Sequence, residues 1–255
     1  MFPTSMLGTR VGAYMSFYEY LNIPKSCEVG STIFKKLFYE KADLSTSDKN
    51  LFIDNINKIT WLYCLKPENI NIKPYKDDNR DYPEIEVIEV EIIKDTKLNR
   101  IAEIIMRAIP YPMLLIFKLD DKIQLYTAHQ RINQNDKSKN TLGEFVSTDW
   151  LDSDSPLCKK LDVKQMRFTN FYALYSDIVD VINIYNATII LPLKDNFTGE
   201  EARVLTAYVD AIEQEIFSLR SELKKETQFN RRMELNIQIK KLEKEKETNI
   251  GEYAQ

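Results

Sequence analysis

The sequence holds few of the residues on which most nucleotide-dependent and metal-dependent enzymes rely. It has six glycines in 255 residues, and none falls in the spacing of a phosphate-binding loop or a dinucleotide fingerprint. His129 is the only histidine, so zinc sites built on paired histidines are excluded. A nucleophile–base pair would have to join His129 to Cys27, Cys64 or Cys158, and nothing in the spacing marks its partner.

Cysteine is also scarce, and long apolar runs are missing. The three cysteines are odd in number and far apart, so they form neither a disulfide framework nor a metal-binding spacing. No apolar run approaches the length of a membrane-spanning helix, and no basic region followed by an apolar core opens the sequence. We therefore expect a cytoplasmic protein with no membrane contact.

Charge is ordinary in total but uneven along the chain. Hydrophobic residues make up 44%, charged residues 29%, and the net charge is −4, which gives no overall electrostatic reason to bind nucleic acid. Four basic residues near the C-terminus are candidates for contact with phosphates: Arg231, Arg232, Lys240 and Lys241. Interleaved glutamates weaken that attraction, so we favour a solvated helix face or a protein contact.

The centre of the chain predicts a strand–helix–strand unit. Residues 85–93 alternate between two faces as a strand does, and residues 98–109 repeat apolar side chains at helical spacing. Asp95 or Thr96 is expected to cap this helix. Residues 113–119 are almost continuously apolar, so they predict a central strand covered on both faces. The helical crossover implies that the two strands are parallel.

The fold class is therefore α/β (or α+β), with a mixed sheet, one strand–helix–strand crossover and a long C-terminal helical arm or hairpin. We divide the chain into a mixed α/β body at 1–150, a linker and helix at 151–197, and the arm at 198–255. The flanking segments predict a helix from Ser45, a strand over 58–65, a polar loop over 73–83, a hairpin strand over 123–128, an edge strand over 145–150 and a helix over 168–185.

The arm begins at Thr198, which is a good helix N-cap. Its apolar residues follow coiled-coil spacing at first and then continue on a face rotated by roughly a third of a turn. Near 227–230 the helix either bends, changes partners or folds back as a hairpin, and the shift favours a change of face or a hairpin over a straight rod. Because an apolar seam needs a cover, we expect six residues to contact the body, a second copy of the chain or another protein: Ile212, Ile216, Leu219, Leu223, Phe229 and Leu235.

A degenerate restriction-type nuclease is the alternative that remains open. Such nucleases use a mixed sheet in which two strands precede a helix and one follows, and acidic residues and a lysine hold magnesium. Glu89 and Glu91 share one face of a predicted strand, and Lys94 lies beyond them. The signature fails in detail, because Lys94 would point to the opposite face of an ideal strand. We favour pairing of both glutamates with cations of a neighbouring strand, and so expect no cofactor, with magnesium as the alternative.

Four runs resemble a bacterial family, domain of unknown function 4391. The most distinctive run is Gln-Phe-Asn-Arg-Arg-Met-Glu-Leu-Asn at 228–236, and the others are 59–63, 84–89 and 108–112. The similarity covers most of the chain, and it implies no activity that can be assigned to particular residues. It does imply a setting, because members are often encoded beside Swi/Snf-type helicases and site-specific DNA methyltransferases, in clusters that resemble restriction or anti-phage systems.

Together these features indicate a non-catalytic accessory or scaffold subunit of a DNA restriction-modification or anti-phage defence assembly. We expect its C-terminal helices to dock a partner protein, a helicase or methyltransferase of the same operon, and nucleic acid to be reached through that complex. The alternatives are the degenerate nuclease, a nucleic-acid-binding subunit, and a homo-oligomer held by the seam between Ile212 and Leu223.

Overall fold

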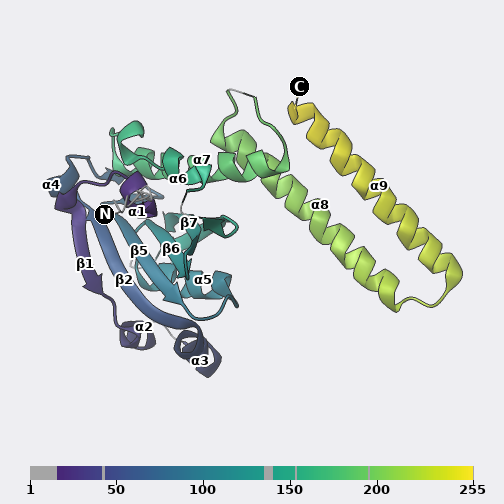
Figure 1. The fold of residues 1–255 in the computed structure, drawn as a ribbon, viewed down its shortest axis with the longest axis horizontal. Helices are drawn as coiled ribbons and strands as arrows, with labels where there is room; N and C mark the ends of the chain where they lie inside the picture. Colours follow the sequence, from purple (N-terminus) through teal and green to yellow (C-terminus); the bar gives the residue numbers. More distant parts are fainter. Residues whose placement is uncertain (1–15, 42–43, 135–139, 153, 195, 255) are drawn as a thin grey trace, which may run out of the picture.

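A computed structural model describes residues 16–41, 44–134, 140–152, 154–194 and 196–254. In this part of the chain, the body is a seven-stranded mixed sheet of order β1-β2-β5-β6-β7-β8, with β9 paired to β7 (Figure 1). The predicted α/β class, with its C-terminal helices, is confirmed. The strands of this sheet are β1 Glu28–Thr32, β2 Ile56–Leu65, β5 Ile85–Ile92, β6 Met113–Leu119, β7 Lys122–Ile132, β8 Asn140–Ser147 and β9 Leu151–Asp152.

The strand–helix–strand unit forms as predicted. Helix α5 (Leu98–Ala108) connects β5 to β6, and the two strands pair in parallel. The cap prediction was wrong, because the residue before α5 is Lys97 in the left-handed region at φ 56°. Both expected caps are engaged elsewhere: Asp95 accepts a hydrogen bond from the Trp150 indole, and the Thr96 hydroxyl accepts one from the side-chain amide of Asn55.

Helices cover both faces of the sheet. On one face lie α2 (Lys35–Lys41), α3 (Thr46–Asn55) and α5, packed around a core that includes Ile88 and Phe117. On the other lie α1 (Phe17–Tyr20), α6 (Pro156–Lys160) and α7 (Phe171–Ile190). The sheet is therefore buried on both sides, which explains why β6 is apolar along most of its length.

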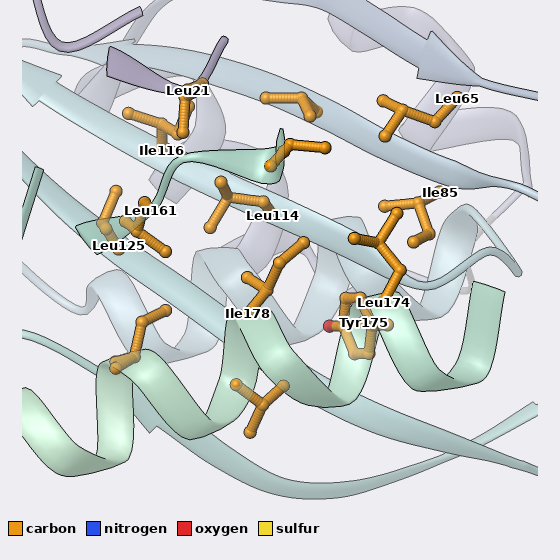
Figure 2. Packing of buried hydrophobic residues seen from close by; sticks show 14 of the residues in the cluster. Leu21, Leu65, Ile85, Leu114, Ile116, Leu125, Leu161, Leu174, Tyr175 and Ile178 are labelled. Carbon is orange, nitrogen blue, oxygen red and sulfur yellow. The ribbon is translucent and has the colours of Figure 1, made fainter. Parts of the chain in front are cut away.

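Helix α7 is fixed to the sheet by both apolar packing and hydrogen bonds. Figure 2 shows Leu174, Tyr175 and Ile178 projecting from this helix toward Ile85 and Leu114 of the sheet. The Tyr175 hydroxyl lies 2.9 Å from the carbonyl oxygen of Met113 and 3.1 Å from both the carbonyl oxygen and the amide nitrogen of Ala128. Buried hydroxyls require such partners, so this contact fixes the helix over β6 and β7.

Several predicted boundaries need correction. The segment 73–83, predicted as a loop, contains a short β-hairpin. The edge strand predicted over 145–150 begins earlier, as β8, and the helix predicted over 168–185 is α7, which begins and ends later. Within the segment predicted as linker and helix, β9 pairs with β7, and α6 and α7 pack on the sheet. The remaining elements are β3 Tyr75–Lys76, β4 Asp81–Tyr82, α4 Pro67–Ile70 and the 3-10 turns η1 Lys25–Cys27 and η2 Val163–Gln165.

The C-terminal arm is an antiparallel helical hairpin that projects from the body (Figure 1). Helices α8 (Gly199–Lys225) and α9 (Phe229–Ala254) form it, which confirms the hairpin alternative. Thr198 caps α8 as predicted, and the amide of Glu201 donates to its hydroxyl over 3.2 Å. In the described residues, no helix is both long and apolar enough to cross a lipid bilayer.

Candidate functional site

The two glutamates singled out in the sequence lie on one face of β5, as expected from strand alternation. Glu91 is opposite Lys58 of β2 and in parallel register with Lys118 of β6. It also accepts a hydrogen bond of 3.1 Å from the side-chain amide of Asn57. Cations on both neighbouring strands therefore flank this carboxylate.

Glu89 is the more buried of the two, with 7% of its surface exposed. Its carboxylate accepts a hydrogen bond from the Tyr18 hydroxyl of α1. Burial raises the pKa of Glu89 above its ordinary value, and the positive charge of Lys118 acts in the opposite direction. Tyr18 and Lys118 thus complete a polar cluster between α1 and the sheet.

Lys94 does not belong to this cluster. Strand β5 ends at Ile92, and Lys94 lies exposed beyond that end. The lysine beside the glutamates is therefore Lys118 of β6, and not the Lys94 of the catalytic alternative. In the sequence, the one signal that leads to Lys118 is the parallel pairing of 85–93 with 113–119, which places it beside Glu91.

A metal ion has little support at the Glu89 cluster. Among the described residues, the one group of three acidic or sulfur side chains close enough to share an ion is Cys64, Glu84 and Glu86, with their ligand atoms within 4.8 Å of one another. In that group, burial and the neighbouring carboxylates raise the pKa of the Cys64 thiol far above its ordinary value. This thiol would have to release its proton before it could bind a metal ion.

His129 is a structural residue. Its Nδ1 atom lies 2.9 Å from the Tyr82 hydroxyl, and its ring packs against those of Tyr172 and Tyr175. Burial lowers the pKa of His129 to about 4. The cysteine–histidine pair considered above is contradicted, because the three thiols hydrogen-bond to other groups: Cys27 to Asn69, Cys64 to Glu86, and Cys158 to the Asp152 carbonyl.

The apolar seam of the arm is covered by the arm itself. Ile212, Ile216 and Leu235 are buried, and Leu219 and Leu223 pack against the same interior. Five of the six expected partner-binding residues therefore pack within the hairpin. Phe229 is the exception, with 72% of its surface exposed.

Phe229 begins a stripe that the sequence analysis did not recognise. Met233 and Ile237 follow it at four-residue spacing on α9, and they are 50% and 63% exposed. On α8, Phe217 is 74% exposed. Residues four apart lie on the same side of a helix, so α9 presents an apolar stripe, Phe229–Met233–Ile237, away from its own partner helix.

The four basic residues proposed for nucleic-acid contact divide into two pairs. Arg231 forms ion pairs with Glu222 at 2.9 Å and Glu234 at 3.1 Å. Arg232 donates to the carbonyl oxygens of Leu223 and Glu226, at the C-terminal end of α8. Both arginines thus stabilise the hairpin turn. The other pair, Lys240 and Lys241, is exposed on α9.

Comparison with known proteins yields a family but no characterised relative. No curated protein and no solved structure matches this chain. A sequence model of a family described as a domain of unknown function, DUF4391, matches residues 21–245. That match covers β1 to β9, α7, α8 and most of α9. The chain therefore belongs to the DUF4391 family.

Proposed function

We propose that this chain is a non-catalytic accessory subunit of a bacterial DNA restriction-modification or anti-phage defence assembly in the cytoplasm. In this proposal, the arm binds a partner protein, a Swi/Snf-type helicase or a DNA methyltransferase. The observation that carries the proposal is the exposed stripe Phe229–Met233–Ile237. Large apolar side chains on a helix that already has a covered inner face are typical of a protein-binding surface.

The shape of the arm supports this role. The base of the arm contacts the body: the cluster of Ala187, Leu191 and Leu205 joins α7 to α8, and Ile250 and Tyr253 of α9 pack on it. The stripe lies at the other end of α9, near the hairpin turn. A partner can therefore bind the tip without displacing anything from the sheet. The choice of a defence assembly rests on the gene neighbourhood of the family, and the docking surface rests on the stripe.

Replacing Ile237 with aspartate tests the docking surface. We expect Ile237→Asp to weaken binding to the helicase or methyltransferase encoded beside the gene by at least about tenfold, because a charge would have to be desolvated at the interface. Affinity is measured by calorimetry with purified proteins. The matched control is Ile93→Asp, since Ile93 is 55% exposed on the body. Equal effects of the two substitutions, or binding that survives deletion of 199–255, would contradict the proposal.

A second candidate function, the degenerate magnesium-dependent nuclease, is favoured by the order of the elements. Strands β2 and β5 precede α5, β6 follows it, and the three strands are adjacent in the sheet, which is the arrangement described above for nuclease cores. The side chains fit less well. Glu89 is bound by Tyr18, and the described residues place no third acidic group within metal-sharing distance of the pair.

A cleavage assay distinguishes the nuclease from the accessory subunit. We expect no magnesium-dependent cleavage of linear, supercoiled or single-stranded DNA by the purified chain, because the Glu89 carboxylate is buried and already accepts a hydrogen bond from Tyr18, whereas magnesium needs carboxylate oxygens that are free to coordinate it. Cleavage that disappears in both Glu89→Ala and Glu91→Ala, and persists in Glu215→Ala, would replace the accessory role with the nuclease. Glu215 is a suitable control because it is an exposed carboxylate of α8, away from the Glu89 cluster.

A further inference from the structure

A pocket of about 360 Å³ opens on the face of the sheet opposite the Glu89 cluster. It lies between α2 and the end of α5, over β2 and β5. Its walls are mostly apolar or aromatic and include Phe38, Trp61, Ile88 and Ile109, while Glu84 and Glu86 also line it. This volume is within the range of small-molecule sites, roughly 300–1,000 Å³. Its composition, apolar walls with two convergent carboxylates, is also typical of such sites.

Glu86 is the group that gives the pocket its chemistry. Only 3% of its surface is exposed, yet its carboxylate is held in one orientation by two donors. The Trp61 indole donates to one oxygen over 2.6 Å, and the Cys64 thiol donates to the other over 3.5 Å. Both donors come from β2, where a bulge interrupts the pairing with β5 between Trp61 and Tyr63.

The bulge explains how two donors reach one carboxylate. Trp61 and Cys64 are separated by an odd number of positions, so in a regular strand they would point to opposite faces. An extra residue in one strand shifts the alternation, and bulges often lie beside functional sites for this reason. The orientation of Glu86 therefore depends on a local irregularity of the backbone.

The charges of the pocket are unbalanced. Lys66 lies 3.9 Å from Glu84 and supplies a partial counter-charge at the rim. Burial has the largest effect on the Glu86 carboxyl and raises its pKa. The hydrogen bonds from Trp61 and Cys64 lower the pKa, and repulsion by Glu84 raises it. A buried carboxylate without a positive partner is costly, and a cation placed between apolar walls removes that cost.

We propose that this pocket binds a small organic cation: an amine, amidine or guanidine carried on an apolar body. The charged group forms a hydrogen-bonded ion pair with Glu86 and faces Glu84, and the apolar body packs on Trp61, Phe38 and Ile109. A metal ion suits the pocket less well, because its walls are mostly apolar and the carboxylates that line it are Glu84 and Glu86, whereas hard cations take roughly six or more oxygen ligands. The proposal does not depend on the docking role of the arm.

Benzamidine is the probe for this site, and neutral benzamide and anionic benzoate are its isosteres. The indole N–H signal of Trp61 reports occupancy, because that proton is donated to Glu86. At pH 8, we expect benzamidine to shift this signal in a saturable way, with a Kd on the order of 1 mM. Benzamide and benzoate should bind at least about tenfold more weakly. The chain has two tryptophans, so Trp150→Phe assigns the signal.

Two variants distinguish an effect of the Glu86 charge on binding from an effect on folding. Glu86→Gln keeps an oxygen that can accept from Trp61 but removes the charge, and we expect it to weaken benzamidine binding at least about tenfold. Glu91→Gln makes the same chemical change on the opposite face of β5, and binding should be unchanged. The proposal is overturned if benzamidine produces no saturable shift up to 10 mM, or binds no tighter than benzamide. Equal binding to wild type and Glu86→Gln also overturns it.

Discussion

Replacing Phe117 with alanine is expected to lower the free energy of unfolding by about 3–5 kcal/mol. Phe117 lies on the central strand β6, has no exposed surface, and packs edge-to-face on Tyr126 with the ring centroids 5.2 Å apart. Helix α5 covers this side of the sheet, so the surrounding atoms can collapse only partly into the space left by the ring. Loss of the ring therefore removes apolar burial and leaves a cavity.

Urea unfolding followed by far-UV circular dichroism measures this effect. The matched control is Phe217→Ala, the same substitution at a side chain that is 74% exposed on α8. Surface changes of this kind usually stay within about 0.5 kcal/mol. A loss below about 1 kcal/mol for Phe117→Ala, or equal losses for the two variants, would show that β6 is not the centre of the core. Because domains are stable by roughly 5–15 kcal/mol, the predicted loss is a large share of the total.

Periodicity was enough to predict the centre of the fold. The run 113–119 is apolar because β6 has helices on both faces, and a fully covered strand leaves that signal in any sequence. The helical hairpin could also be predicted, since the apolar stripe changes face near Thr227, where the chain turns between α8 and α9. The position of α7 could not be predicted from the sequence, because its contacts with the sheet join residues far apart in the chain.

The candidate sites were harder to predict because they depend on register. Lys118 lies beside Glu91 only because β5 and β6 pair in one particular parallel register. Glu86 was not singled out, since ideal alternation sends Trp61 and Cys64 to opposite faces and only the bulge in β2 turns both toward it. The segment that covers the apolar seam of α8 could not be identified for another reason. Coiled-coil spacing shows that a helix has a partner, but it does not show which segment the partner is.

Two buried groups give the stability of the chain opposite dependences on pH. Burial raises the pKa of Glu86 from 4.5 to about 7, so the folded state holds a proton that the unfolded state releases above pH 4.5. Stability from this group is complete below pH 4.5 and is lost as the pH rises to 7. Burial lowers the pKa of His129 from 6.5 to about 4. Its contribution is complete above pH 6.5 and is lost as the pH falls to 4. Between pH 4.5 and 6.5 the two trends offset each other.

Glu86→Gln should therefore measure how much the titration of this carboxyl contributes to the pH dependence of stability. Removing the titrating carboxylate is expected to raise stability at pH 8 by an amount on the order of 2–3 kcal/mol, since each pKa unit corresponds to about 1.4 kcal/mol. Well below pH 4.5, where Glu86 is protonated in both the folded and the unfolded state, the variant and wild type should differ little.

Urea unfolding at intervals from pH 5 to pH 8 measures the difference, with Glu91→Gln as the matched change on the same strand. In Glu86→Gln, stability should fall less with rising pH between 5 and 7 than it does in wild type, because the contribution of the Glu86 carboxyl is removed. A variant that is less stable than wild type at pH 8 would mean that the Glu86 carboxylate has a favourable partner within the folded chain. In that event the pocket would have no need of an external cation, and the same measurement would count against the proposed ligand.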